Sequence, residues 1–273
     1  MALKKIGFTA EIEHEDKRTL ENVIVQKEPT IIKKSIVKVY FPDRNLTCSF
    51  YNDMFNLKRG DIVYVEGKLE GKRGRVVDIN YNFKIKLSDY KRIIGVADTN
   101  VIGEFHLADS HFITIDEGAL KYEQIASWFK APEKESEEYV SSSGEEVFNL
   151  NDLGGMNIKK EVAERGHEYY MENRVVYIEL NHGKGRALVT GRQTYDVEFF
   201  YKDEDITGLV CNCYCTGTCK HEFATMLQLR DILAIIKSEY PFVKHNDYLA
   251  AVSKARFFEF VIDGNTKGTF TMG

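Results

Sequence analysis

Proline, long apolar runs and signal-peptide features are all scarce in this sequence. Only 4 of its 273 residues are proline and 20 are glycine, which excludes collagen-like and proline-rich architectures. No apolar stretch approaches the roughly 20 residues that span a bilayer. The first residues, MALKK, lead into charge without the apolar segment of a signal peptide. We therefore expect a soluble, cytoplasmic protein with no membrane partner.

The chain as a whole also carries no net positive charge. The formal net charge is -5 at pH 7 and the pI is about 5.9. Hydrophobic residues make up 43% and charged residues 29%, which is ordinary for a globular protein with a packed core. Any contact with nucleic acid must therefore be local.

Familiar catalytic motifs are absent. The chain has no GxSxG and no GxGxxG, and residues 67–72 do not have the spacing of a phosphate-binding loop. Strand alternation places His106 and His111 on opposite faces unless residues 108–110 form a turn. No further cluster of metal-ligating residues accompanies them, so we favour polar strand ends over a metal or catalytic pair. We expect no enzymatic activity; an enzyme whose site the sequence does not reveal is the alternative.

Short strand-like segments dominate the chain before residue 130. Glycines at 60, 67, 71 and 74 punctuate them, and this spacing predicts a small β-barrel. Cys48 lies on the apolar face of one segment, which favours a core position over a metal ligand. The expected strands are 36–41, 46–50, 61–66, 75–79, 83–87, 101–105 and 112–115, and a short helix is expected at 121–129.

Residues 131–152 are rich in acidic residues, serine and glycine and lack apolar periodicity, which is typical of a solvated linker. An acidic interaction tail is the alternative. Beyond it we expect helices at 158–172 and 222–237, one more within 248–260, and strands at 175–180, 186–190, 195–201 and 206–210.

The predicted fold class is thus α+β, with an N-terminal β-rich region joined to a C-terminal sheet-plus-helix domain. The predicted domains are a β-rich domain at 1–130 with a barrel at about 36–92, the acidic linker at 131–152, a zinc-binding domain at 153–240, and a tail with a short helix at 241–273.

Four of the 5 cysteines crowd into residues 211–219, which indicates a metal site and not a disulfide framework. A CxC pair that ends a strand and a CxH pair that opens a helix can meet at one zinc ion if the loop between them turns tightly. Gly217 lies in that loop. Four thiol and imidazole ligands leave no open position, so the zinc would be structural.

These residues resemble the SWIM zinc finger, whose pattern is CxC, a short gap and CxH at the start of a helix. The likeness continues upstream in Arg165-Gly166 with Tyr169-Tyr170, in Asn173-Arg174-Val175, and in Val189 to Val197, and it covers about residues 158–236. The resemblance implies zinc bound by Cys211, Cys213, Cys219 and His221. It also implies binding to DNA or to proteins, often beside a helicase or transposase.

Cys215 departs from this pattern, because it forms a second CxC with Cys213. We prefer Cys211 with Cys213, since the longer gap before Cys219 gives the loop room to return. An exchange of the two pairs is the alternative.

Residues 59–79 resemble the KOW motif, which implies an SH3-like barrel that serves nucleic-acid or protein recognition. Residues 58–92 carry ten basic and five acidic side chains, an excess of five positive charges, with interleaved tyrosines. Phosphates would meet basic side chains and bases could stack on Tyr81 or Tyr90. The candidate nucleic-acid-binding residues are Lys68, Lys72, Arg73 and Arg75.

The sequence therefore predicts a zinc-binding protein of SWIM type that binds DNA or RNA without catalysis. The alternative is a protein-interaction adaptor that docks on a helicase, a transposase or another nucleic-acid enzyme. A solvated barrel face with its aromatic residues in the core would fit the same charge pattern. The oligomeric state does not follow from the sequence.

Overall fold

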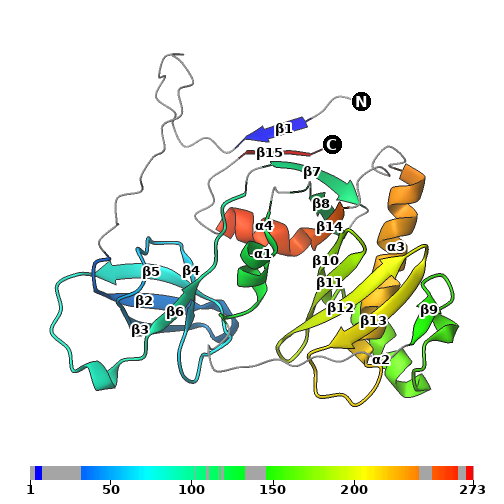
Figure 1. Cartoon of the computed structure of the whole chain (residues 1–273). Helices are drawn as coiled ribbons and strands as arrows, with labels where there is room; N and C mark the ends of the chain where they lie inside the picture. Colours follow the sequence, from blue (N-terminus) through cyan, green and yellow to red (C-terminus); the bar gives the residue numbers. More distant parts are fainter. Residues whose placement is uncertain are drawn as a thin grey trace.

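A computed structural model describes residues 4–7, 32–101, 103–108, 111–115, 117, 120–132, 146–239, 248–263 and 269–272. These residues form two sheets and four α-helices (Figure 1). The mixed α+β class is therefore confirmed. No helix in this described part combines the length and the apolar character needed to cross a membrane.

The smaller sheet has five strands, and its two edges come together. Tyr51 donates its backbone N–H to the carbonyl of Lys91 at 2.9 Å, and a parallel bridge joins Tyr51 to Arg92. A glycine is required at position 74, because a Cβ there would lie 2.2 Å from Cγ1 of Val39. In spatial order the strands are β3 (Leu46–Asn52), β2 (Ser35–Phe41), β5 (Gly74–Asn80), β4 (Ile62–Val65) and β6 (Ile93–Val96).

One predicted strand of this region is wrong. Residues 83–87 alternate apolar and basic residues, but they form no strand, and the last of them begins the 3-10 turn η2 (Leu87–Asp89). The free edge of β4 pairs with β6 instead, whose Ile93 is fully buried, whereas Leu87 is largely exposed. A second 3-10 turn, η1 (Pro42–Arg44), ends at Asn45 in the left-handed region.

The larger sheet has ten strands, drawn from both sides of the acidic stretch. All its neighbouring pairs are antiparallel except β15 with β7. In spatial order the strands are β1 (Lys4–Gly7), β15 (Thr269–Met272), β7 (Gly103–Ala108), β8 (Phe112–Ile115), β14 (Tyr248–Ser253), β10 (Val175–Asn181), β11 (Lys184–Thr190), β12 (Thr194–Lys202), β13 (Asp205–Cys211) and β9 (Val147–Asn149).

The sheet thus combines strands from the predicted N-terminal domain, the predicted zinc-binding domain and the predicted tail. The short helix of the tail is present as α4 (Lys254–Asp263), but residues 248–253, expected to be helical, form β14. This strand lies between β8 and β10 and is buried on both faces at its centre, so its apolar run has no alternation to mark it as a strand.

Helices cover both faces of the ten-stranded sheet (Figure 1). One face packs against α3 (Lys220–Glu239), on which α2 (Lys160–Met171) rests, and a 3-10 turn η3 (Leu153–Gly155) precedes α2. The other face packs against α1 (Tyr122–Phe129) and α4. Each face of the sheet thus has its own hydrophobic core. Successive residues of β10 pack into different cores, with Ile178 on the α3 side and Tyr177 on the α1 side.

Helices α1 and α4 also join the two sheets. Tyr64 of β4 donates its hydroxyl to the carbonyl of Ser127 at 2.9 Å. Arg73 forms an ion pair with Glu259 at 3.3 Å, and its guanidinium lies 4.9 Å from the ring centre of Phe260. The position of the small sheet against the large one is therefore set by specific side chains.

Candidate metal centre

The end of β13 and the start of α3 bring the four predicted ligands together. Cys211 is the last residue of β13, and Cys219 directly precedes α3. The backbone N–H of Cys219 donates to the buried carboxylate of Glu222 at 2.6 Å, and the Thr225 hydroxyl donates to the carbonyl of His221 at 2.8 Å. These bonds fix the first turn of the helix, which presents Cys219 and His221 to the strand end.

The geometry of the four donor atoms suits a single metal ion. The ligand atoms of Cys211, Cys213, Cys219 and His221 all lie within 4.8 Å of one another. Nδ1 of His221 is 3.6 Å from Sγ of Cys211 and 3.7 Å from Sγ of Cys219. Sulfur and nitrogen ligands of a tetrahedral zinc, with bonds of about 2.3 and 2.0 Å, lie about 3.6 Å apart. The four residues are therefore close enough to bind a metal ion, and the donor set is compatible with zinc.

Burial acts in opposite ways on the imidazole and on the thiols of this cluster. It lowers the pKa of His221 to about 4, helped by the nearby charge of Lys220, so the imidazole is neutral and its lone pair is available at neutral pH. Burial raises the pKa of Cys213 to about 12. The thiol of Cys211, followed by burial, raises the pKa of Cys219. A bound cation would have to displace these thiol protons, so metal affinity should rise with pH.

Cys215 lies outside this cluster. It is exposed, as are its neighbours Tyr214 and Thr216, whereas Cys219 and His221 are almost fully buried. Gly217 lies in the loop between the two ligand pairs, and a Cβ added there would have no atom within 4 Å. Cys48 is half-buried and packs against the core of the small sheet.

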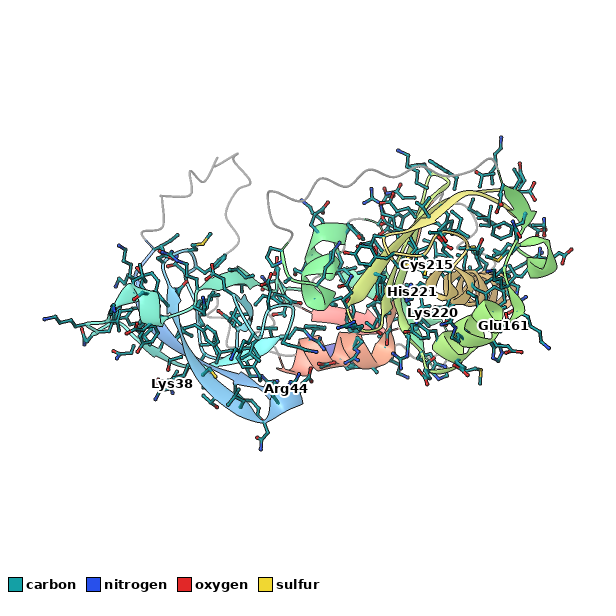
Figure 2. The ribbon with its side chains drawn as sticks, turned by 90° about the horizontal axis from the view of Figure 1, so that it is seen from below. Lys38, Arg44, Glu161, Cys215, Lys220 and His221 are labelled. Atoms are coloured by element: carbon teal, nitrogen blue, oxygen red, sulfur yellow. The ribbon has the colours of Figure 1, made fainter. Side chains whose placement is uncertain are left out.

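Two tyrosines enclose the imidazole. The ring of Tyr195 stacks on His221 with centroids 4.0 Å apart, and Tyr169 meets the same ring edge-on at 5.4 Å. Lys220 and Arg174 each place a cationic group 4.6 Å from the Tyr169 ring centre. Figure 2 shows His221 and Lys220 together at the start of α3, with Cys215 nearby. Tyr169, Arg174 and Tyr195 belong to the segments on which the SWIM resemblance rests, and the resemblance gave them no role.

Asp196 is a polar hub that sequence reasoning did not find. Its carboxylate accepts from the Tyr122 hydroxyl at 2.7 Å, from Nζ of Lys130 at 2.9 Å and from Nδ2 of Asn212 at 2.9 Å. Asn212 lies between Cys211 and Cys213, and its side-chain oxygen Oδ1 accepts from the backbone N–H of Asp196 at 3.0 Å. One carboxylate therefore connects the loop of the metal ligands to both ends of α1.

We expect Asp196→Ala to destabilise the fold by about 1–3 kcal/mol, because the variant loses the partly buried ion pair with Lys130 and the hydrogen bonds to Tyr122 and Asn212. Urea unfolding followed by circular dichroism measures the loss. The control is Glu198→Ala, at an exposed position two residues along the same strand. Equal stability of the two variants would contradict the role of Asp196.

The four basic residues predicted to meet nucleic acid do not form one exposed group. Lys68 is exposed, whereas Lys72 and Arg75 are half-buried. Arg73 is engaged with Glu259, and it also donates to the carbonyl of Trp128 at 3.4 Å. Its guanidinium joins the small sheet to α1 and α4.

Other charged and aromatic groups lie on the same small sheet. The side chain of Lys91 lies beside Gly67, with its Cγ 3.4 Å from the position of a Cβ there, and so adjoins the turn that carries Lys68. Tyr81 is 53% exposed, and Tyr90 is half-buried. Lys68, Lys91 and Tyr81 are exposed, as are Lys58, Lys84 and Lys86 of the same segment.

Of the two histidines singled out in the sequence, the structure describes the side chain of one. His111 is exposed at the start of β8, and the side chain of His106 lies outside the described residues. Most of the predicted linker, residues 133–145, also lies outside them.

Comparisons of the chain with protein-family models, with curated proteins and with solved structures found no match. The functional argument therefore rests on the geometry of the metal centre and on the surfaces around it.

Proposed function

We propose that this chain is a zinc-binding protein of SWIM type that binds nucleic acid without catalysing a reaction. The observation that carries the proposal is the convergence of Cys211, Cys213, Cys219 and His221 within 4.8 Å. A cluster of three thiols and one imidazole saturates a tetrahedral ion, so the metal would hold β13 to α3 and leave no position for substrate.

The SWIM assignment draws support from residues outside the ligand set. Tyr169 and Tyr195, both in the upstream pattern, pack on the ring of His221. Gly166, also in that pattern, lies against the start of α3, where a Cβ would come within 3.0 Å of the Lys220 carbonyl oxygen. The pattern residues thus surround the metal ligands, which accounts for their occurrence together.

Nucleic acid is the partner that the small sheet suits best. Lys68 and Lys91 extend from adjacent turns, and Tyr81 exposes about half of its surface. Lysines can neutralise phosphates while an exposed ring stacks on a base. Arg73 does not belong to this surface, since its guanidinium is bound between the sheets.

We expect Lys68→Glu with Lys91→Glu to weaken binding of a single-stranded oligonucleotide and to flatten its salt dependence by about one unit per lost phosphate contact. Fluorescence anisotropy at two salt concentrations measures both effects. The control is Lys237→Glu, which reverses the charge of an exposed lysine near the end of α3, far in the sequence from Lys68 and Lys91.

If the double variant still binds the oligonucleotide tightly, the nucleic-acid site does not lie at Lys68 and Lys91 of the small sheet. Absence of binding even at low salt would favour the protein-interaction adaptor. Substitution of Tyr81 by alanine should lower the affinity and leave the salt slope unchanged.

A further inference from the structure

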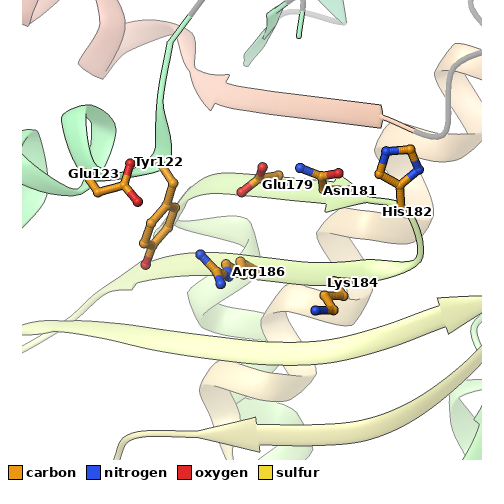
Figure 3. Close-up of a pocket in the computed structure, with 7 residues that line it drawn as sticks. All are labelled: Tyr122, Glu123, Glu179, Asn181, His182, Lys184 and Arg186. Carbon is orange, nitrogen blue, oxygen red and sulfur yellow. The ribbon is translucent and has the colours of Figure 1, made fainter. Parts of the chain in front are cut away.

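A cavity of about 420 Å³, lined by charged, polar and tyrosine side chains, opens on the face of the ten-stranded sheet that carries α1 (Figure 3). Its floor is formed by β10 and β11 and the hairpin between them, and its wall by the start of α1. The metal ligands extend from the strand end to the helix on the opposite face, so the cavity is separate from the metal centre. Its volume lies in the usual range for small-molecule sites, about 300–1,000 Å³.

The cavity holds an acidic and a basic side chain that face each other without pairing. Glu179 lies directly opposite Arg186 in the register of β10 and β11, and both line the cavity. Glu179 is only 9% exposed. Among the ion pairs of the described residues, none joins Glu179 to Arg186 or to Lys184. A buried carboxylate without a cationic partner is costly, and such a cost is typical of a binding site.

The basic side is held in place. The guanidinium of Arg186 lies 4.9 Å from the ring centre of Tyr122, and the hydroxyl of Tyr122 is bound to Asp196 at 2.7 Å. Lys184 lies on the same face of β11, two residues before Arg186. This end of the cavity therefore suits a carboxylate.

The mixture of charges identifies the class of ligand. Glu179 and Glu123 line the same space as Arg186 and Lys184, so a polyanion such as a nucleic-acid backbone would meet repulsion there. A ligand with one positive and one negative group would satisfy both sides. Asn181, at the edge of the cavity, offers an amide donor and acceptor for a further polar group.

We propose that this cavity binds a small zwitterion of the α-amino acid class, whose ammonium group pairs with Glu179 and whose carboxylate pairs with Arg186. The site is independent of the nucleic-acid function proposed above. Ligand binding replaces the missing ion pair between the two strands and brings the buried carboxylate its counter-charge.

The test uses the full-length, metal-loaded chain and saturation-transfer difference NMR with a mixture of the common L-amino acids, followed by calorimetry with each amino acid that gives a signal. We expect at least one amino acid to bind. Glu179→Gln and Arg186→Gln should each weaken its binding about tenfold or more, because each removes one of the two charge pairs.

Glu198→Gln is the matched control, since Glu198 is exposed on β12, faces Arg186 in register and does not line the cavity. The Glu198→Gln variant should bind the amino acid with the same affinity as the unmodified chain. If Glu179→Gln does not fold, judged by its melting curve and metal content, Lys184→Gln replaces it, because Lys184 is exposed and its loss should still weaken binding several-fold.

Three results would overturn the proposal. The first is absence of any signal from the amino acids at millimolar concentration. The second is equal affinity for acetate or methylamine, each of which carries only one of the two charges. The third is unchanged binding by the Glu179 and Arg186 variants.

Discussion

Cys219→Ser or His221→Ala should abolish metal binding and unfold the region that the metal holds together. Both side chains are almost fully buried and supply two of the four donors. Metal binding contributes about 10–16 kcal/mol in zinc-finger peptides, as much as the whole stability of a typical domain, about 5–15 kcal/mol. Elemental analysis of the purified variants and the loss of helical signal in circular dichroism measure the effect.

Cys215→Ser is the control, because the exposed Cys215 lies outside the cluster. This variant should keep the metal and the stability of the unmodified chain. A variant set in which Cys215→Ser loses the metal while Cys211→Ser keeps it would show that the ligand pair is Cys213 and Cys215.

Gly166→Ala should destabilise the chain, although alanine is the better helix former. In an open helix this change would add up to about 1 kcal/mol of stability. Here a Cβ would lie 2.9 Å from Cδ1 of Phe223 and 3.0 Å from the backbone oxygen of Lys220. The backbone of α3 would have to move at the residue before His221, so we expect a net loss of about 1–3 kcal/mol and faster release of the metal.

Urea unfolding of Gly166→Ala, together with the rate of metal transfer to a chelator, measures both effects. Glu168→Ala, on the exposed side of the same helix, should change stability by no more than about 0.5 kcal/mol. A Gly166→Ala variant more stable than the unmodified chain would contradict the close packing of α2 on α3.

The sequence predicted most of the elements near the metal centre, because their signals are local. The apolar pattern of residues 175–210 predicted the four strands β10–β13, and the CxC and CxH spacing predicted a ligand cluster at the junction of strand and helix. A ligand set of this kind depends on neighbours in the chain, and Cys211 and His221 are only ten residues apart.

Contacts between distant segments were not visible in the sequence. Strand β14 is distant in sequence from β8 and β10, the two strands that it joins in the sheet. Its apolar run LAAV fits a helix as well as a strand that is buried on both faces. The carboxylate of Asp196 accepts hydrogen bonds from Tyr122, Lys130 and Asn212, which are 16 or more residues away in the sequence, so no local pattern predicts these contacts. Arg73 lies in a basic segment of the sequence, and no local pattern marks its partner Glu259, which is distant in the chain.

X-ray absorption spectroscopy at the zinc edge of the purified, unchelated protein tests the central claim most directly. We predict one zinc per chain with a first shell of three sulfurs at about 2.3 Å and one nitrogen at about 2.0–2.1 Å. Three thiolates and Nδ1 of His221 would give this shell. A shell of four sulfurs, or protein that carries no stoichiometric zinc, would contradict the assignment of Cys211, Cys213, Cys219 and His221 as the metal ligands.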